Sequence, residues 1–82
     1  MQFHTDLDPE LNWPRLRMDF DNGWTVSLAF HMSAKNGCDH AQASVAAFQT
    51  GKKGKTQLLE HEATAGEAAA LIYQVQGWEK PQ

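Results

Sequence analysis

Two histidines and the chain's one cysteine lie close together in the sequence, as His31, Cys38 and His40. Imidazole and thiolate groups are the usual ligands of zinc, and His4 or His61 could add a fourth. Structural zinc sites usually pair their ligands two to four residues apart on a turn, whereas a single residue separates Cys38 from His40. In the competing interpretation Cys38 is a small buried hydrophobe and the histidines are ordinary loop residues. We therefore expect no cofactor and keep a small metal-binding domain as an alternative.

The same cysteine could act as a nucleophile if His31 or His40 lowered its pKa. No oxyanion-hole motif accompanies it, and the serines lack a nucleophile-elbow setting. A chain of 82 residues also leaves little room for a substrate pocket of ~300 Å³ or more. We expect a non-enzymatic protein without catalytic residues.

Lysines gather in one short segment, at Lys52, Lys53 and Lys55, where a protruding turn could contact phosphates together with Arg15 and Arg17. The formal net charge of −3 opposes general affinity for nucleic acid, since such domains are usually basic. Lysines also keep turns and sheet edges soluble. A nucleic-acid-binding accessory protein is therefore an alternative and not the main expectation.

The composition is that of an ordinary globular domain, with 41% hydrophobic and 21% charged residues. A lone cysteine excludes an internal disulfide and fits a reducing compartment. No apolar run approaches the ~20 residues that a membrane span requires, and the first residues do not resemble a targeting signal. We expect a cytoplasmic protein without membrane contact.

The elements that must position these residues begin with a hairpin between Leu16 and Phe30. If residues 21–23 form a three-residue loop, Met18 lies opposite Val26 and Leu16 opposite Leu28, so the apolar side chains share one face. Gly23 can then adopt the left-handed conformation that completes the turn. This register predicts strands near residues 15–20 and 24–32.

Three further elements follow the hairpin. Residues 33–40 are predicted to form a loop, residues 41–50 a strand with small residues on one face, and residues 55–61 a strand with Leu58 or Leu59 directed inward. Thr64 and Glu67 form a capping-box pattern that opens a helix, and Gly77 suits the position after its end. The sequence thus predicts an α+β fold, an antiparallel meander of three to four strands with one C-terminal helix packed on one face.

The first fourteen residues are expected to form a partly ordered segment or a short helical turn, with residues 15–82 as a single α+β domain. Asp8 could cap such a turn and Pro9 could occupy its first position. The segment is acidic, and a sheet edge with tryptophans near the chain ends could bind another protein. The residues predicted to contact a protein partner are Trp13, Trp78, Asp6, Asp8 and Glu10. A small core and free sheet edges also make a homodimer possible, with a monomer of low stability as the competing interpretation.

Three segments resemble a pattern found in small uncharacterised phage and prophage proteins: residues 20–28 (Phe-Asp-Asn-Gly-Trp-Thr-Val-Ser-Leu), 36–39 (Asn-Gly-Cys-Asp) and 43–48 (Ala-Ser-Val-Ala-Ala-Phe). The resemblance covers roughly the middle third of the chain, and the long N-terminal extension and the lysine-rich turn depart from it. It implies a fold more firmly than an activity. It implies a small protein-binding module, such as a phage or mobile-element accessory protein that inhibits or modulates a larger host complex, or a packaging accessory that binds another phage protein.

Overall fold

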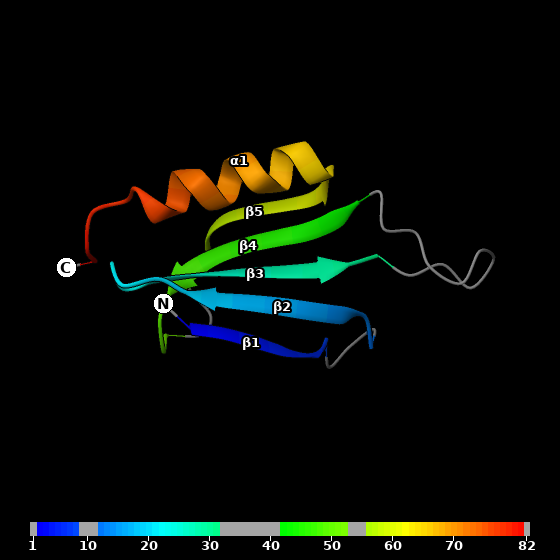
Figure 1. Ribbon diagram of the computed structural model, residues 1–82, viewed down its shortest axis with the longest axis horizontal. Coiled ribbons are helices and arrows are strands. Elements are labelled where there is room, and N and C mark those ends of the chain that lie inside the picture. Colours follow the sequence, from blue (N-terminus) through cyan, green and yellow to red (C-terminus); the bar gives the residue numbers. More distant parts are fainter. Residues whose placement is uncertain (1, 9–11, 32–41, 53–55, 82) are drawn as a thin grey trace.

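Residues 2–8, 12–31, 42–52 and 56–81 are described by the computed structural model, and they form an antiparallel five-stranded sheet with one helix on one of its faces (Figure 1). The elements are β1 (Gln2–Leu7), β2 (Pro14–Asp19), β3 (Trp24–Phe30), β4 (Ala43–Gln49), β5 (Thr56–Ala63) and α1 (Ala65–Gln76). Each strand pairs with the next one in sequence, so the sheet is a simple meander. None of the helices in these ranges has the length and apolar character needed to cross a membrane.

The predicted hairpin is confirmed in register and in loop length. Met18 lies opposite Val26 and Leu16 opposite Leu28. The amide of Gly23 donates to the carbonyl of Phe20 at 3.2 Å, and Gly23 has a φ of +88°, the left-handed conformation that the three-residue loop requires. The apolar alternation of this segment therefore predicted its register from local sequence alone.

The next two strands also follow the predicted pattern. Ala43, Val45 and Ala47 are buried on one face of β4, as expected for a strand whose small residues lie under a helix. In β5 it is Leu58 that lies on the same face, opposite Ala47, whereas Leu59 is on the other face and 55% exposed. The predicted loop at residues 33–40 lies outside the described residues.

The predicted number of strands was wrong, because the N-terminal segment supplies a fifth. Residues 2–7 pair along their whole length with β2, from Gln2 opposite Asp19 to Leu7 opposite Pro14. All six β1 residues are exposed. Backbone hydrogen bonds to β2 hold this strand, so it forms without the burial that makes β3 recognisable. The short helical turn predicted after Asp8 falls on residues 9–11, which lie outside the described residues; on either side of them the Asn12 amide donates to the Asp8 carbonyl at 2.8 Å.

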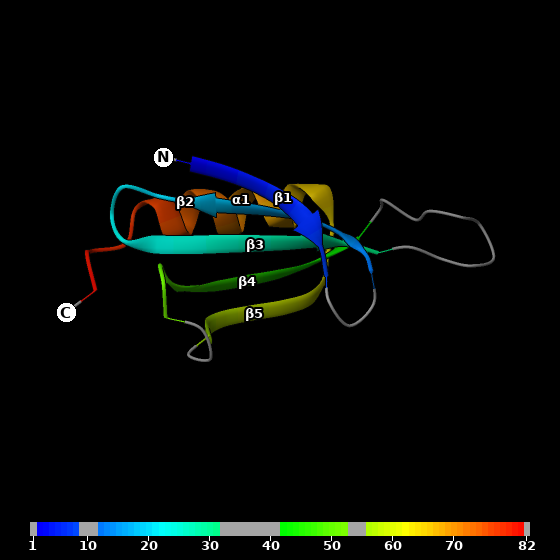
Figure 2. The ribbon, with the colours of Figure 1, turned by 90° about the horizontal axis from the view of Figure 1, so that it is seen from below.

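Helix α1 opens with the predicted capping box: the Glu67 amide donates to Thr64 Oγ1, and the Thr64 amide donates to the Glu67 carboxylate. Ala68 and Val75 are the buried helix residues, and both pack against the sheet. The helix lies against β3, β4 and β5 and not against β1 or β2. In Figure 2 β1 and α1 both lie above β3, and β5 lies below it, as expected for a twisted sheet. The core is therefore concentrated under the helix, at Val26, Val45, Ala47 and Val75.

The hairpin loop closes the other end of the helix. The side-chain amide of Asn22 donates to the carbonyls of Val75, Gln76 and Trp78 at 2.9, 3.2 and 3.0 Å, and its Oδ1 accepts from the Trp24 amide at 3.1 Å. These carbonyls belong to the last turn of α1 and the residues after it, where the helix ladder ends; the Val75 carbonyl also accepts from the Trp78 amide at 3.0 Å. One side chain of the β2–β3 loop thus satisfies the end of a helix more than fifty residues later.

Candidate interaction surface

The face of the sheet opposite α1, which we call the polar face, carries paired charges on β1 and β2, with apolar residues such as Phe48 and Leu59 on β4 and β5. Arg15 donates two hydrogen bonds to Asp6, with Nε–Oδ1 at 2.8 Å and Nη2–Oδ2 at 2.6 Å. These bonds hold the pKa of the Asp6 carboxyl below its usual value of 3.8. Thr25, which is fully buried, donates to Asp19 at 2.7 Å. Burial raises the pKa of Asp19, but the hydrogen bonds from Thr25 and His4 outweigh it, so the net shift is downward.

The residues predicted to contact nucleic acid are only partly available on this face. Arg15 is engaged by Asp6, and the guanidinium of Arg17 lies over the ring of Phe48, 5.8 Å from its centroid. Lys52 is exposed after β4, while Lys53 and Lys55 lie outside the described residues. The two arginines therefore serve contacts within the sheet, which weakens the case for a phosphate-binding surface.

Of the predicted metal ligands, only His31 belongs to the described residues, since Cys38 and His40 do not. His31 packs against Trp13 with the two rings tilted by 40° and their centroids 4.7 Å apart, and its Nε2 is 3.1 Å from Ser44 Oγ. Because the Ser44 hydroxyl donates to the His61 carbonyl, it accepts from His31 Nε2–H. Within the described ranges, no group of three or more histidine, cysteine or acidic side chains is close enough to hold a metal ion.

Of the residues predicted to bind a protein partner, those that the structure describes do not form one surface. Trp13 is half-buried beside the start of β2, whereas Trp78 packs edge-on against Trp24 near the other end of that strand, with ring centroids 4.8 Å apart. Asp6 is paired with Arg15 on the polar face, and the Asp8 amide bonds the Trp13 carbonyl at 2.7 Å. Glu10 lies outside the described residues. Trp78 therefore takes part in packing within the domain. Asp6 lies on the polar face, and Asp8 lies in the connection between β1 and β2.

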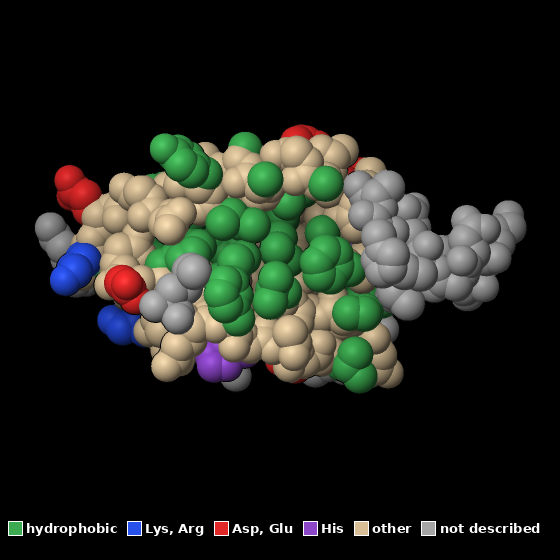
Figure 3. All heavy atoms as spheres, in the orientation of Figure 1, with side chains coloured by type: hydrophobic (Ala, Val, Ile, Leu, Met, Phe, Trp, Pro, Cys, Tyr) green, Lys and Arg blue, Asp and Glu red, His purple; other side chains and the backbone are tan. Residues whose placement is uncertain are grey.

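A different surface lies on the helix side of the sheet, where α1 packs over β3, β4 and β5 and does not extend over β1 or β2. The register places Phe3, Leu7, Leu16 and Met18 on this face, because Phe3 is opposite Met18 and Leu16 is opposite the buried Leu28. In Figure 3 apolar side chains gather in a continuous strip below the helix and above the lower edge of the sheet. We call this strip the trough; its apolar residues are Phe3, Leu7, Leu16, Met18, Leu28 and Phe30.

Exposure within the trough increases from the helix toward the sheet edge. Leu28 and Met18 are 5% and 6% exposed, Leu16 and Phe30 are half-buried, and Phe3 and Leu7 are 59% and 58% exposed. The helix ends the exposed strip on one side, and β1 ends it on the other. A contiguous apolar surface of this kind on a small domain is typical of a protein-binding site.

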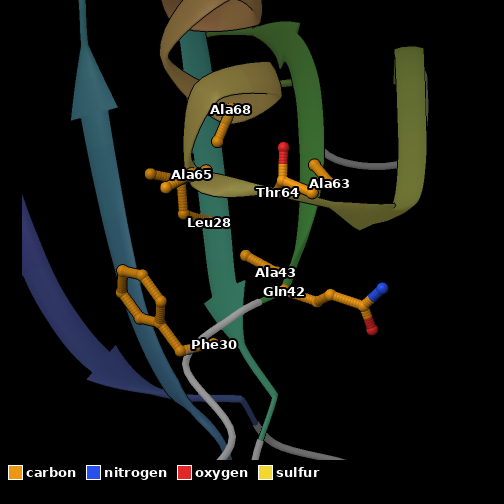
Figure 4. A pocket seen from close by; sticks show the side chains of 8 residues that line it. All are labelled: Leu28, Phe30, Gln42, Ala43, Ala63, Thr64, Ala65 and Ala68. Atoms are coloured by element: carbon orange, nitrogen blue, oxygen red, sulfur yellow. The ribbon is translucent and has the colours of Figure 1, made fainter.

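The trough deepens slightly beneath the first turn of α1. Leu28, Phe30, Ala43, Ala63, Thr64 and Ala68 are among the side chains that converge there (Figure 4). The recess has a volume of about 60 Å³, far below the ~300–1,000 Å³ of small-molecule sites. Its lining is almost wholly aliphatic or aromatic and offers no acid–base pair. It can receive an apolar side chain, and it is unsuited to substrate chemistry.

The trough was not predicted from the sequence, although a signal for it was present. Phe3, Thr5 and Leu7 alternate with polar residues at the spacing of a half-buried strand. The alternation is short, and it does not show whether these side chains are buried under the helix or exposed, because that depends on how many strands the helix covers. That number is a property of the assembled fold.

Neither a scan of protein-family models nor searches of curated proteins and of solved structures find a match to this chain.

Proposed function

We propose that this protein is a small, non-enzymatic protein-binding module and that the trough is its docking surface. The observation that carries the proposal is the apolar strip that runs from the buried Leu28 and Met18, beside α1, to the exposed Phe3 and Leu7 on β1. Burying apolar surface is the dominant favourable term in most protein association. The partner that fits is an amphipathic segment of a larger protein, which would lay its apolar side chains along the strip between helix and edge strand.

Charge supports an apolar mode of recognition. Between Ala65 and Gln76 the helix wall of the trough carries one charged residue, Glu67. The charged pairs of β1 and β2 lie on the opposite face of the sheet, where Arg15 and Asp6 bond one another. A partner would therefore meet little desolvation cost from charges at the centre of the surface.

The resemblance to small phage proteins suggests the biological setting. In that setting a protein of this size would act by occluding a larger host or phage protein, and inhibition of a host complex is one form of such action. The proposal thus extends to an accessory protein that modulates its partner by covering part of it.

The test is capture from a bacterial host with a matched pair of variants, Leu16→Gln and Leu58→Gln. Both leucines are half-buried on the same face and pack against the same core, but only Leu16 lies in the trough. We expect a stoichiometric protein that is retained at high salt by wild type and by Leu58→Gln and lost with Leu16→Gln. Urea unfolding of both variants checks that they lose similar stability.

Three results would contradict the proposal. A partner that Leu16→Gln retains as well as wild type does would place the binding surface elsewhere. Nucleic acid released at high salt would favour the lysine-rich turn and Arg15 and Arg17 instead. No stoichiometric partner at either salt concentration would count against a binding module for proteins of that host.

A further inference from the structure

We infer that β1 is a dimerisation strand, and that two copies of this chain pair antiparallel through β1 to form a continuous ten-stranded sheet. The inference concerns the sheet edge and does not depend on the partner proposed for the trough. It begins from the outer edge of β1: within the described part of the chain β1 pairs with β2 alone, all its residues are exposed, and its pairing is regular from Gln2 to Leu7. Unpaired backbone groups of this kind are a template for another strand.

The edge strand β1 lacks the features that usually prevent such pairing. Its six residues, Gln-Phe-His-Thr-Asp-Leu, contain no lysine or proline, and its ladder has no bulge. The opposite edge differs, since β5 has register shifts at both Ala43/Val45 and Ala47/Phe48. It also carries Glu60 and Glu62, which would oppose one another across a two-fold axis at His61. Of the two edges, β1 is the one suited to self-association.

Symmetry then selects one register. Two identical antiparallel strands are related by a two-fold axis perpendicular to the sheet, so the axis must pass beside one residue and its own copy. With the axis at Thr5, Phe3 lies opposite Leu7 of the second copy on the trough face, and His4 lies opposite its Asp6 on the polar face. Both pairs occur twice, so apolar residues meet apolar residues and a carboxylate meets an imidazole.

The neighbouring registers lack this complementarity. An axis at His4 would place the two imidazoles opposite each other and Phe3 opposite Thr5. An axis at Asp6 would place two carboxylates opposite each other and Thr5 opposite Leu7. Like groups directly opposite are unfavourable in a sheet, and cross-strand apolar and opposite-charge pairs are favourable. Only the Thr5 register matches on both faces.

On the polar face, His4 and Asp6 of β1 also contact charged residues of β2. His4 contacts Asp19 through Nε2 at 3.0 Å, so its second ring nitrogen, Nδ1, is the one that would bond Asp6 of the other copy. Asp6 is already held in place by Arg15. The pairing would join these contacts into a row that runs from Arg15 through Asp6 and His4 to Asp19, twice across the interface.

The helices do not obstruct this arrangement, because α1 covers β3 to β5 and leaves β1 clear. From one β4 to the other there are seven strand spacings of about 4.8 Å, so the two helices would stand about 34 Å apart in a flat sheet. Both would lie on the same face. The two troughs would meet at the axis and form one apolar groove with a helix on each side.

The register is tested by single cysteines in a Cys38→Ser background of the full chain. The variants are His4→Cys, Thr5→Cys and Asp6→Cys, each oxidised mildly and analysed on a non-reducing gel. We expect Thr5→Cys to form a covalent dimer, since Thr5 meets its own copy at the axis. The other two should stay monomeric on the gel, because diagonal neighbours are ~7–8 Å apart and a disulfide needs Cα atoms within about 7 Å. Crosslinking of His4→Cys or Asp6→Cys in place of Thr5→Cys would overturn this register.

Sedimentation velocity tests the dimer itself with a second matched pair, Leu7→Glu and Leu59→Glu. The two leucines are 58% and 55% exposed on opposite edges of the sheet, so neither substitution removes core packing. Wild type should sediment at twice the 9.2 kDa chain mass. Leu7→Glu should weaken association roughly twofold to thirtyfold, because the lost pair occurs twice, and Leu59→Glu should leave it unchanged. A wild-type monomer at millimolar concentration, or loss of the dimer with Leu59→Glu alone, would refute the inference.

Discussion

Replacement of Asn22 by aspartate should destabilise the protein far more than its place in a surface loop suggests. The Asn22 amide group carries two N–H donors for three carbonyls at 2.9–3.2 Å, and its oxygen accepts from Trp24. Aspartate keeps the acceptor and loses both donors. At ~1 kcal/mol for each lost bond, plus ~0.3–1 kcal/mol for a negative charge at a helix C-terminus, the cost is ~2–3 kcal/mol.

The measurement is urea or thermal unfolding at neutral pH, with Gln76→Glu as the control. Gln76 is exposed in the last turn of α1, so its substitution makes the same amide-to-carboxylate change without breaking the cap. For a domain of this size, ~2–3 kcal/mol corresponds to a fall in Tm of roughly 8–24 °C. The control should cost ~1 kcal/mol or less.

The loss of stability caused by Asn22→Asp should also depend on pH. The carbonyls around position 22 disfavour a carboxylate, so the folded-state pKa of the new aspartate should lie above its unfolded value. A group of this kind stabilises the folded state at pH values below its unfolded pKa and loses that contribution as pH rises through its folded pKa. The deficit relative to wild type should therefore shrink on acidification. Equal losses for Asn22→Asp and Gln76→Glu would refute the view that Asn22 caps the helix.

Two further predictions concern the hairpin loop and the polar face. Gly23→Ala and Gly51→Ala place a side chain at φ values of +88° and +81°, and each should cost ~1–2 kcal/mol in the free energy of unfolding. A Cβ at Gly23 would also stand 3.0 Å from Pro81 Cδ, whereas a Cβ at Gly51 would meet no atom within 4 Å. In parallel urea titrations Gly23→Ala should therefore lower the free energy of unfolding more than Gly51→Ala does. Adding Pro81→Ala to Gly23→Ala should remove that difference. Asp19→Asn should make the free energy of unfolding depend less on pH in acid. Burial raises the pKa of Asp19, but the hydrogen bonds from Thr25 and His4 lower it by more, so the net shift is downward. The carboxylate therefore stabilises the wild-type fold above pH 3.8, and this contribution is lost as the pH falls below that value. Identical acid limbs in wild type and Asp19→Asn would show that this carboxylate does not contribute.

The parts of the fold that depend on local pattern were predictable. Met18, Val26 and Leu28 mark the hairpin by their alternation, and Thr64 with Glu67 marks the start of the helix, because each signal lies within a few residues of the structure it specifies. The buried face of β4 was predictable for the same reason.

The remainder depends on contacts between distant segments. Strand β1 buries no side chain, so its sequence carries little hydrophobic signal. The cap from Asn22 to α1 joins residues 53 to 56 positions apart, and no local motif announces it. Trp78 was predicted from the sequence to contact a protein partner, and in the structure it packs against Trp24. The trough arises because a single helix is too narrow to cover five strands, which only the assembled sheet can show.

The separation of Asn22 from its helix also matters during biosynthesis. The contacts between β2 and β3 are local in sequence, so this hairpin can begin to pair once residues 14–30 have left the ribosome. Val75 is made 53 residues after Asn22, a delay of about 3–10 s at ordinary rates of synthesis. During that interval Met18, Val26 and Leu28 have no helix above them, and the nascent hairpin presents its apolar face to chaperones and to neighbouring chains.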